Sequence, residues 1–396
     1  MVVDNHHCVS AFAGEDVSSL PSPFLTIPIH NNNNLQYFGD VGIGSGAKNF
    51  RVIYDTGSER LWVPSAACTS SVCKMHHRFD SDQSSTFRPG SGDDVQLAYG
   101  TGHVRVQMHH DDVRLPSKGV EPAHEPIPKG LTSFENQENT KTLISSYPVG
   151  LATSVATRPF SSLKQIDGLF GIGQNTKFAK AEKLFSFYLS NDTGKEGALM
   201  VGGIDKGRLD PNEEKNFHWF PTKGDTWSLD LVGLKVGDSL LTNLCSPEAP
   251  CSALVDSGSS NITGPPEDVS KILSQIHATC GGKDGGNSPP ISLVLRDAQG
   301  IQHEYPLSSK EYSIDFRDTN ECNVALSALN MGQKKWVLGN TFLRRYLSVF
   351  DQPNHRIGFA KSHHDNEDVG VITRGCPILP IVMGRAQKIG LKFLFN

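Results

Sequence analysis

The sequence predicts a mostly β protein with two similar β-rich lobes and an active-site cleft between them. Three observations predict this fold class. The chain of 396 residues has 38 glycines and 23 prolines and no long helical periodicity, which favours many short strands joined by turns. A chain of this length can also form more than one hydrophobic core. Finally, one strand-and-turn unit occurs twice, once in each half of the chain.

The repeated unit is an apolar strand that leads into Asp-Thr-Gly or Asp-Ser-Gly. The first copy, residues 52–58, reads Val-Ile-Tyr-Asp-Thr-Gly-Ser, and the second, residues 253–259, reads Ala-Leu-Val-Asp-Ser-Gly-Ser. Two apolar residues and a glycine follow each copy, at residues 169–171 and 337–339. Asp, Ser and Gly are common in ordinary turns, so one copy alone is a weak signal. Two copies in the same apolar frame predict two lobes related by a pseudo-twofold axis.

Each copy places an aspartate, Asp55 or Asp256, at the end of an apolar strand. If the lobes are related by twofold symmetry, the two carboxyl groups meet at the axis. Neighbouring carboxylates do not both ionise easily, so one pKa falls, the other rises, and the pair titrates as one unit. The ionised member can then take a proton from water while its partner protonates a peptide carbonyl. This pattern predicts peptide hydrolysis by an acid–base pair, with no metal and no cofactor.

Composition and patterning divide the rest of the chain. Residues 1–23 are polar and contain no Lys or Arg, so we expect a leader or prosegment remnant that does not act as an inhibitory prosegment. They show no basic segment followed by an apolar core, so no signal peptide is visible. We expect an N-terminal catalytic lobe at 24–205, a C-terminal catalytic lobe at 206–361 and a C-terminal extension at 362–396. The net charge of −5 does not suggest nucleic-acid binding, and no apolar run is long enough to span a membrane.

Helical signals are few. Residues 178–190 are one candidate helix, and residues 265–277 are another because Pro and acidic residues stand at its start. The asparagine run at 31–34 is expected to form a loop. The polar, proline-bearing segment at 116–142 is expected to be an exposed insertion.

Two pairs of cysteines lie close together in turn-like sequence, Cys68 with Cys73 and Cys245 with Cys251. Disulfides suit these short loops better than zinc, because the spacings are at or beyond the edge of those in finger knuckles. Disulfides imply an oxidising compartment. We therefore expect the secretory pathway, a secretory organelle, a lysosome-like compartment or secretion.

The segment from about Phe24 to Lys361 resembles the pepsin family of eukaryotic aspartic proteases, with a lean toward cathepsin D and the plasmepsins. The resemblance rests on residues 55–65 and 256–265, which match the two catalytic loops of the family. Ser257 stands where the family more often has Thr, and it still supplies a hydroxyl. The resemblance implies a pepsin-like bilobal fold and an aspartic endopeptidase with an acidic pH optimum, made as a zymogen. It also implies a monomer that takes protein or peptide substrates and binds pepstatin-type inhibitors.

The resemblance also assigns functional residues. Tyr99, Gly100 and Thr101 correspond to the flap, a hairpin that closes over the substrate, and Trp62 cooperates with Tyr99. His103, just beyond the flap tip, is a candidate for tuning specificity. The residues expected to support the catalytic pair are Thr56, Gly57, Ser58, Ser257, Gly258 and Ser259. The residues expected to line the substrate pocket are Ile53, Phe160, Ile166, Leu254 and Val337. For Ile53, Phe160 and Ile166 the alternative is that they are plain core.

By the same resemblance the family's three disulfides would be Cys68–Cys73, Cys245–Cys251 and Cys280–Cys322. Cys8 and Cys376 lie outside the family core and either pair or stay free. Asn191 begins a glycosylation triplet in a predicted loop, whereas the triplet at Asn261 is expected to be inaccessible. The four His-His pairs show no ligand spacing and are expected to be solvated loop residues, at 6–7, 76–77, 109–110 and 363–364.

A second functional class stays open at this point, namely an inactive relative that only binds peptides or proteins. Such relatives lose a catalytic aspartate, a loop glycine or the flap tyrosine. The present sequence keeps Asp55, Asp256, Gly57, Gly258 and Tyr99. The sequence therefore favours an active endopeptidase.

Overall fold

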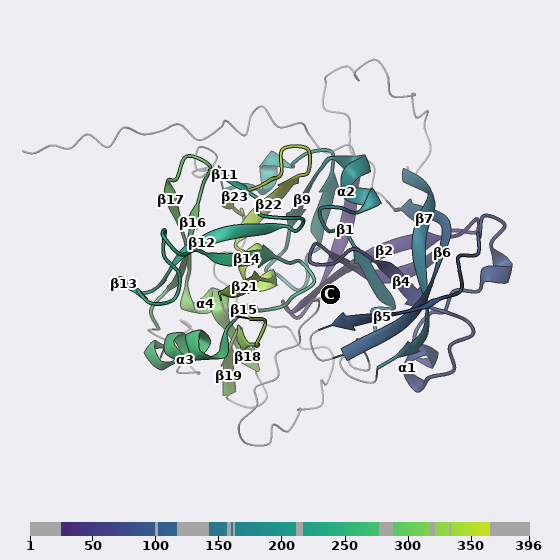
Figure 1. Ribbon diagram of the computed structural model, residues 1–396, viewed down its shortest axis with the longest axis horizontal. Coiled ribbons are helices and arrows are strands. Elements are labelled where there is room, and N and C mark those ends of the chain that lie inside the picture. Colours follow the sequence, from purple (N-terminus) through teal and green to yellow (C-terminus); the bar gives the residue numbers. More distant parts are fainter. Residues whose placement is uncertain are drawn as a thin grey trace, which may run out of the picture.

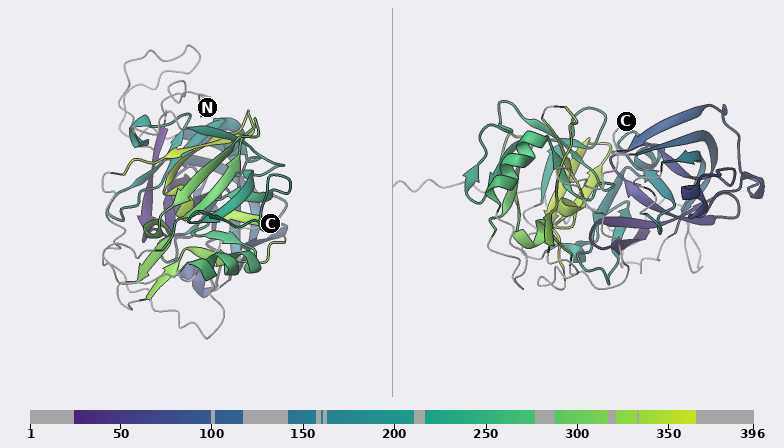
Figure 2. Two further views of the ribbon diagram at one scale, coloured as in Figure 1. Left: turned by 90° about the vertical axis from the view of Figure 1, so that its left-hand side faces the viewer. Right: turned by 90° about the horizontal axis from the view of Figure 1, so that it is seen from below.

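The computed structural model describes residues 25–99, 102–116, 142–156, 160, 163–210, 217–276, 288–316, 321–332 and 334–364. These residues form two β-rich lobes that lie side by side (Figure 1 and Figure 2). The described strands form a 13-stranded sheet, an 8-stranded sheet and a 2-stranded sheet. The predicted mostly β, bilobal fold is confirmed.

The 13-stranded sheet begins in the N-terminal lobe and runs into the space between the lobes. Its order is β11-β23-β22-β9-β10-β1-β2-β3-β8-β4-β7-β6-β5. In chain order its strands are β1 (Leu25–Asn32), β2 (Gln36–Ile43), β3 (Lys48–Asp55), β4 (Leu61–Pro64), β5 (Asp94–Tyr99), β6 (Gly102–Leu115), β7 (Thr142–Val155), β8 (Gly168–Gly171), β9 (Leu184–Tyr188), β10 (Gly197–Val201), β11 (His218–Pro221), β22 (Tyr346–Asp351) and β23 (Arg356–Lys361).

The 8-stranded sheet forms most of the C-terminal lobe. Its order is β17-β16-β12-β14-β21-β15-β20, with β13 paired to β12. Its strands are β12 (Ser228–Val236), β13 (Ser239–Leu240), β14 (Cys251–Val255), β15 (Ile262–Gly264), β16 (Ile291–Arg296), β17 (Gln302–Leu307), β20 (Leu326–Ala328) and β21 (Lys335–Leu338). The 2-stranded sheet pairs β18 (Ser313–Phe316) with β19 (Glu321–Val324).

The repeated unit has the same strand pairing in both lobes. In the first, β8 lies parallel to β3, with Asp55 opposite Gly171, and antiparallel to β4. In the second, β21 lies parallel to β14, with Val255 opposite Leu338, and antiparallel to β15. In each lobe the two strands that flank the Asp-Thr/Ser-Gly turn therefore lie on either side of the strand that leads into Gly171 or Gly339.

Gly171, at the end of β8, and Gly339, just after β21, are required because the backbone that follows the Asp-Thr/Ser-Gly turn crosses directly over them. A Cβ at Gly171 would lie 2.4 Å from the backbone nitrogen of Arg60. A Cβ at Gly339 would lie 2.5 Å from the carbonyl oxygens of Asn261 and Ser259. No side chain fits at these distances, which explains why both copies of the motif end in glycine.

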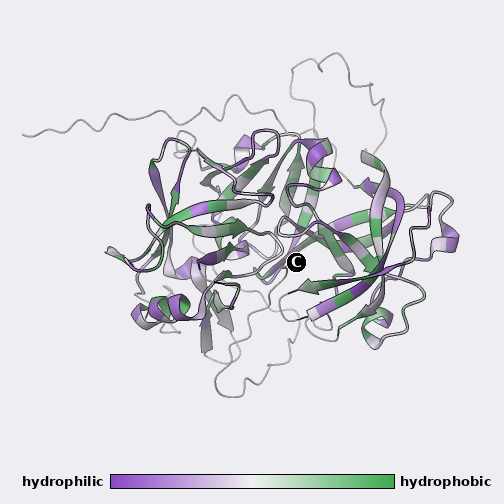
Figure 3. Cartoon of the chain, in the orientation of Figure 1, coloured by the Kyte–Doolittle hydropathy of each residue, from purple (hydrophilic) through white to green (hydrophobic). Residues whose placement is uncertain are grey.

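The hydrophobic core continues from one lobe to the other. The last strands of the chain return to the large sheet, where β22 pairs with β9. Phe185 and Phe350 stack there at a centroid distance of 4.9 Å, and Trp227 lies 5.2 Å from Phe350. Many strands of the two lobes carry segments coloured as hydrophobic in Figure 3. These aromatic contacts join segments that lie far apart in the chain.

The described α-helices are short, namely α1 (Ser71–Lys74), α2 (Lys177–Glu182), α3 (Pro266–Gln275), α4 (Ser309–Tyr312) and α5 (Asn340–Leu343). There are also short 3₁₀ turns at η2 (Ser81–Gln83) and η4 (Lys206–Arg208). The predicted helix at 265–277 is confirmed by α3, which has Glu267 and Asp268 in its first turn. None of the helices in the described ranges is long and apolar enough to cross a membrane.

The helix predicted over residues 178–190 is wrong in its second half. The helix α2 ends at Lys183, whose φ of 61° breaks the helical backbone, and β9 follows directly. The pairing of β9 with β10 and β22 overrides the local helical pattern.

The asparagine run lies at the tip of the hairpin between β1 and β2. Asn33 and Asn34 both have φ of 57°, a conformation that asparagine tolerates better than most residues. The expected leader lies outside the described residues, as do most of the insertion and of the C-terminal extension.

Candidate active site

Asp55 and Asp256 are fully buried and are held in matching ways. One oxygen of Asp55 accepts a hydrogen bond from the backbone of Gly57 at 2.9 Å, and the other accepts one from the hydroxyl of Ser58. Asp256 accepts the equivalent pair from residues 258 and 259, at 2.8 and 2.6 Å. Both carboxyl groups are therefore fixed in orientation by groups of their own loop.

The two loops that carry Asp55 and Asp256 touch each other. A Cβ at Gly57 would lie 2.6 Å from the Cγ atom of Asp256, so only glycine fits between them. Burial, followed by the negative charge of Asp256, raises the pKa of Asp55 well above its usual range. Burial also raises the pKa of Asp256, although a hydrogen bond from Asp55 opposes the shift. The two carboxyl groups are thus arranged to share a proton.

Thr56 and Ser257 hold the two loops together. The backbone N–H of each residue donates to the side-chain oxygen of the other, at 3.0 Å in both directions. The hydroxyl of Thr56 also donates to the carbonyl oxygen of Val255 at 2.8 Å, and that of Ser257 donates to Tyr54 at 2.6 Å. Serine at position 257 thus supplies the hydroxyl that links the loops.

Three aromatic side chains of the first lobe lie together. The ring of Phe160 lies 5.4 Å from Trp62 and 5.9 Å from Tyr99. Tyr99 is buried at the end of β5, where it pairs with Gly102 across the hairpin to β6. Burial and the charge of Asp55 both raise the pKa of Tyr99. Residues 100 and 101 of the expected flap tip lie outside the described residues.

The expected pocket residues divide between the two lobes. Ile53 and Ile166 belong to the apolar cluster that also holds the three aromatic side chains. Leu254 and Val337 are buried in the other lobe, where they lie opposite each other on β14 and β21. The structure therefore brings three expected pocket residues, counting Phe160, next to Tyr99 and Trp62.

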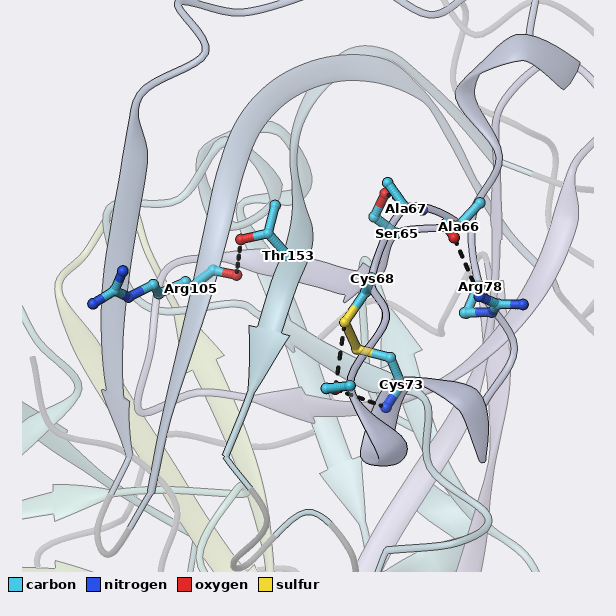
Figure 4. The surroundings of a disulfide bond; sticks show 9 residues. Ser65, Ala66, Ala67, Cys68, Cys73, Arg78, Arg105 and Thr153 are labelled. Carbon is cyan, nitrogen blue, oxygen red and sulfur yellow. Dashed lines mark hydrogen bonds between the residues drawn. A yellow bond between two sulfur atoms is a disulfide. The ribbon is translucent and has the colours of Figure 1, made fainter.

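Disulfides join Cys68 to Cys73 and Cys245 to Cys251, with Cα–Cα distances of 6.0 and 5.3 Å. Figure 4 shows the first, which closes the loop around α1; Arg78, just beyond this loop, donates a hydrogen bond to the carbonyl oxygen of Ala66 at 3.1 Å. The remaining expected pair, Cys280–Cys322, lies outside the residues whose side chains are described. Cys8 and Cys376 also lie outside them.

The polar residues of the other motifs occupy varied environments. Asn191 lies half-buried in the turn between β9 and β10, whereas Asn261 is buried and donates to the hydroxyl of Ser327 at 2.9 Å. The expectation that all histidine pairs are solvated loop residues is wrong. His76 and His364 have buried side chains, and the pair at 109–110 lies within β6. Packing against neighbouring segments, which the local sequence does not reveal, buries the rings of His76 and His364.

Asp167 is a residue that the motif analysis did not single out. It is buried, although it stands just before the apolar strand β8. A charged residue inside the frame Ile-Asp-Gly-Leu-Phe-Gly was the only signal in the sequence.

Comparisons with known proteins agree with this geometry. The profile of the family described as eukaryotic aspartyl protease matches residues 36–122 and 129–362. The chain is 33% identical over 352 residues to cathepsin E of Rattus norvegicus, covering 84% of this chain and 81% of that protein. It is 32% identical over 350 residues to a renin of Echis ocellatus, covering 84% and 82%. It is 29% identical over 354 residues to plasmepsin VIII of Plasmodium berghei, covering 83% and 87%. The chain therefore belongs to the pepsin-like family of eukaryotic aspartyl proteases.

Proposed function

We propose that this chain is an active aspartic endopeptidase whose catalytic residues are Asp55 and Asp256. The observation that carries the proposal is the matched burial of the two carboxyl groups, each oriented by a backbone N–H and a hydroxyl. A relative that only binds peptides has no need for two adjacent buried acids, which are costly to ionise. A buried pair of acids costs stability, so we expect a protein to keep one only where the pair has a function.

The proposed reaction uses a single shared proton. The ionised carboxylate takes a proton from a water molecule, and the water oxygen bonds to the carbonyl carbon of the substrate. The protonated partner gives its proton to the carbonyl oxygen. When the C–N bond breaks, the newly protonated carboxyl gives its proton to the departing nitrogen, and its ionised partner takes a proton from one of the two hydroxyls of the tetrahedral intermediate, so the pair returns to its starting state. Since one proton must be present, activity is expected to peak at acidic pH with a bell-shaped profile.

The surrounding residues have supporting roles in this proposal. Tyr99 closes over the substrate with residues 100 and 101, while Trp62 supports it. Ile53, Phe160 and Ile166 accept an apolar side chain from the first lobe, and the second lobe contributes Leu254 and Val337. We also propose the lobe boundaries 24–205 and 206–361, a monomeric state, and a zymogen. The two disulfides support an oxidising compartment of the secretory pathway.

A peptide-library digestion tests the proposal. The purified chain is incubated with the library between about pH 3 and pH 8, the range over which carboxyl pairs and histidines titrate. Pepstatin is added to one half of the samples. Cleavage at acidic pH that pepstatin blocks supports the endopeptidase. Tight binding of pepstatin without cleavage at any pH, after any leader has been removed, supports the inactive, peptide-binding relative.

A further inference from the structure

The buried carboxylate of Asp167 joins separate parts of the first lobe. It accepts hydrogen bonds from the backbone N–H of Arg51 at 2.9 Å and from that of His77 at 2.8 Å. The ring of His77 lies at 3.1 Å through its Nδ1 atom. The backbone N–H of Asp167 itself donates to Arg51 at 2.7 Å. An ionised carboxylate with this set of donors is a strong local anchor.

His76 completes the surroundings of Asp167. Its side chain is only 4% exposed, and its Nδ1 atom lies 3.9 Å from an oxygen of Asp167. That nitrogen has no hydrogen-bond partner among the described residues. A proton on this nitrogen makes the contact with the carboxylate attractive, and the positive charge of a doubly protonated ring strengthens that attraction. The arrangement is therefore sensitive to the protonation of His76.

This cluster connects elements that serve the catalytic site. Arg51 belongs to β3, the strand that ends in Asp55, and Asp167 directly precedes β8, whose last residue pairs with Asp55. Asp167 also directly follows Ile166 of the pocket cluster. The histidines follow the loop closed by Cys68 and Cys73, and both cysteines pack in that same apolar cluster.

We propose that Asp167, His76 and His77 form a clasp that positions the wall of the substrate pocket. The proposal rests on the proposed endopeptidase function, since it assigns positioning residues for that reaction. Asp167 holds the clasp closed through its backbone donors, and a proton on His76 tightens it. The charged groups that act on His76 are Asp167, which favours the proton, and His77, which opposes it. Burial lowers the pKa of His76, so the proton is gained in the acidic range in which the enzyme is proposed to work.

Steady-state kinetics on the full chain test the clasp. The substrate is a fluorogenic peptide with a large apolar residue before the cleaved bond, and KM is measured at about pH 4 and about pH 6, of which the lower favours the protonated histidine. We expect His76→Gln to raise KM about threefold at the lower pH only, the size of a modest charge-pair contribution. Asp167→Asn should raise KM about tenfold at both pH values, with kcat changed less than about twofold, because the pocket and not the chemistry is affected.

His109→Gln is the matched control. His109 lies on β6 against Phe87, and burial also lowers its pKa, but it is not part of the clasp. We expect its KM to equal that of the wild type at both pH values. Three kinetic outcomes overturn the clasp. The ratio of KM at the two pH values is the same for His76→Gln and the wild type, or protonation of His76 raises the KM of the wild type. In the third outcome, Asp167→Asn lowers kcat and leaves KM unchanged.

A second readout does not depend on activity. In an NMR titration of histidine-labelled protein, Asp167→Asn should lower the pKa of His76, because the carboxylate favours its proton. An unchanged titration overturns the clasp. Wild-type protein that cleaves no peptide refutes the proposed function instead and leaves this titration as the test. If Asp167→Asn does not fold, Asp167→Glu takes its place. This variant keeps the negative charge but changes its position, so we expect KM to rise while the pKa of His76 stays that of the wild type.

Discussion

Thr56 and Ser257 exchange hydrogen bonds between the two halves of the chain, each donating its backbone N–H to the other's side-chain oxygen at 3.0 Å. Both hydroxyls then donate onward to backbone carbonyls of the opposite strand, at Val255 and Tyr54. The result is a closed network without a free donor. It couples the position of Asp55 to that of Asp256, because each stands next to one member of the pair.

Removing one hydroxyl from this network should be costly. Ser257→Ala leaves the N–H of Thr56 and the carbonyl oxygen of Tyr54 without those partners, so we expect a loss of about 3 kcal/mol in unfolding free energy. Urea unfolding measures it. Ser348→Ala is the control, because the Ser348 hydroxyl is also buried but has no hydrogen-bond partner in the described part of the chain. Equal losses in the two variants would contradict the network.

The catalytic pair is tested by removing one acid at a time. Asp55→Asn and Asp256→Asn should each lower kcat at least about 10²-fold, because neither remaining acid can both accept and donate the proton. Asparagine keeps the shape of the side chain, so the fold should remain. Asp238→Asn, at an exposed position, serves as the control and should cleave like the wild type. A tenth of wild-type activity in both single variants, with contamination excluded, would refute the pair.

The pair also predicts a pH dependence of stability. The pKa values of Asp55 and Asp256 are raised in the folded protein, so the fold holds a proton that the unfolded chain releases above about pH 4. This contribution to stability is complete below the unfolded pKa and is lost as pH rises through the folded values. Asp55→Asn removes the shared proton. Its stability relative to the wild type should therefore improve from about pH 4 to about pH 7, as denaturant unfolding at each pH would measure. A constant difference would mean that the pKa values are not raised.

The duplicated motif explains why the sequence predicts so much of this site. The apolar strand, the aspartate and the later glycine can each be read directly from the sequence. Gly171 and Gly339 are needed because another part of the backbone crosses too close to them for a side chain to fit. Two similar units in one chain also imply how they face each other. The fold class and the candidate pair could therefore be predicted without a structure.

Other features depend on contacts that the sequence does not encode locally. Residues 184–188 are predicted from the sequence to continue a helix, but they pair with β10 and β22 and form β9. His76 and its neighbour look like ordinary loop histidines, and only the approach of Asp167, from a distant segment, gives them a shared environment. Such features arise from tertiary packing, which periodicity and spacing do not report.

The two disulfides should differ in their effect on function although their loops are of similar size. By loop-closure entropy, each contributes about 2 kcal/mol to stability, so both paired replacements, Cys68→Ala with Cys73→Ala and Cys245→Ala with Cys251→Ala, should lower the unfolding free energy by about that amount. Cys68 and Cys73 pack in the apolar cluster of Trp62, Tyr99 and the expected pocket. Cys245 and Cys251 pack in the large core instead.

We therefore expect the replacement of Cys68 and Cys73 to raise KM as well as to lower stability, because the pocket wall loses a constraint. The replacement of Cys245 and Cys251 should leave KM unchanged at temperatures where the variant stays folded. Denaturant unfolding and steady-state kinetics on both variants make the comparison, and peptide mapping without reduction checks each link in the wild type. Equal effects on KM would show that the first disulfide stabilises the lobe without shaping the pocket. A link from Cys68 to a cysteine of the second lobe would contradict the two-lobe arrangement itself.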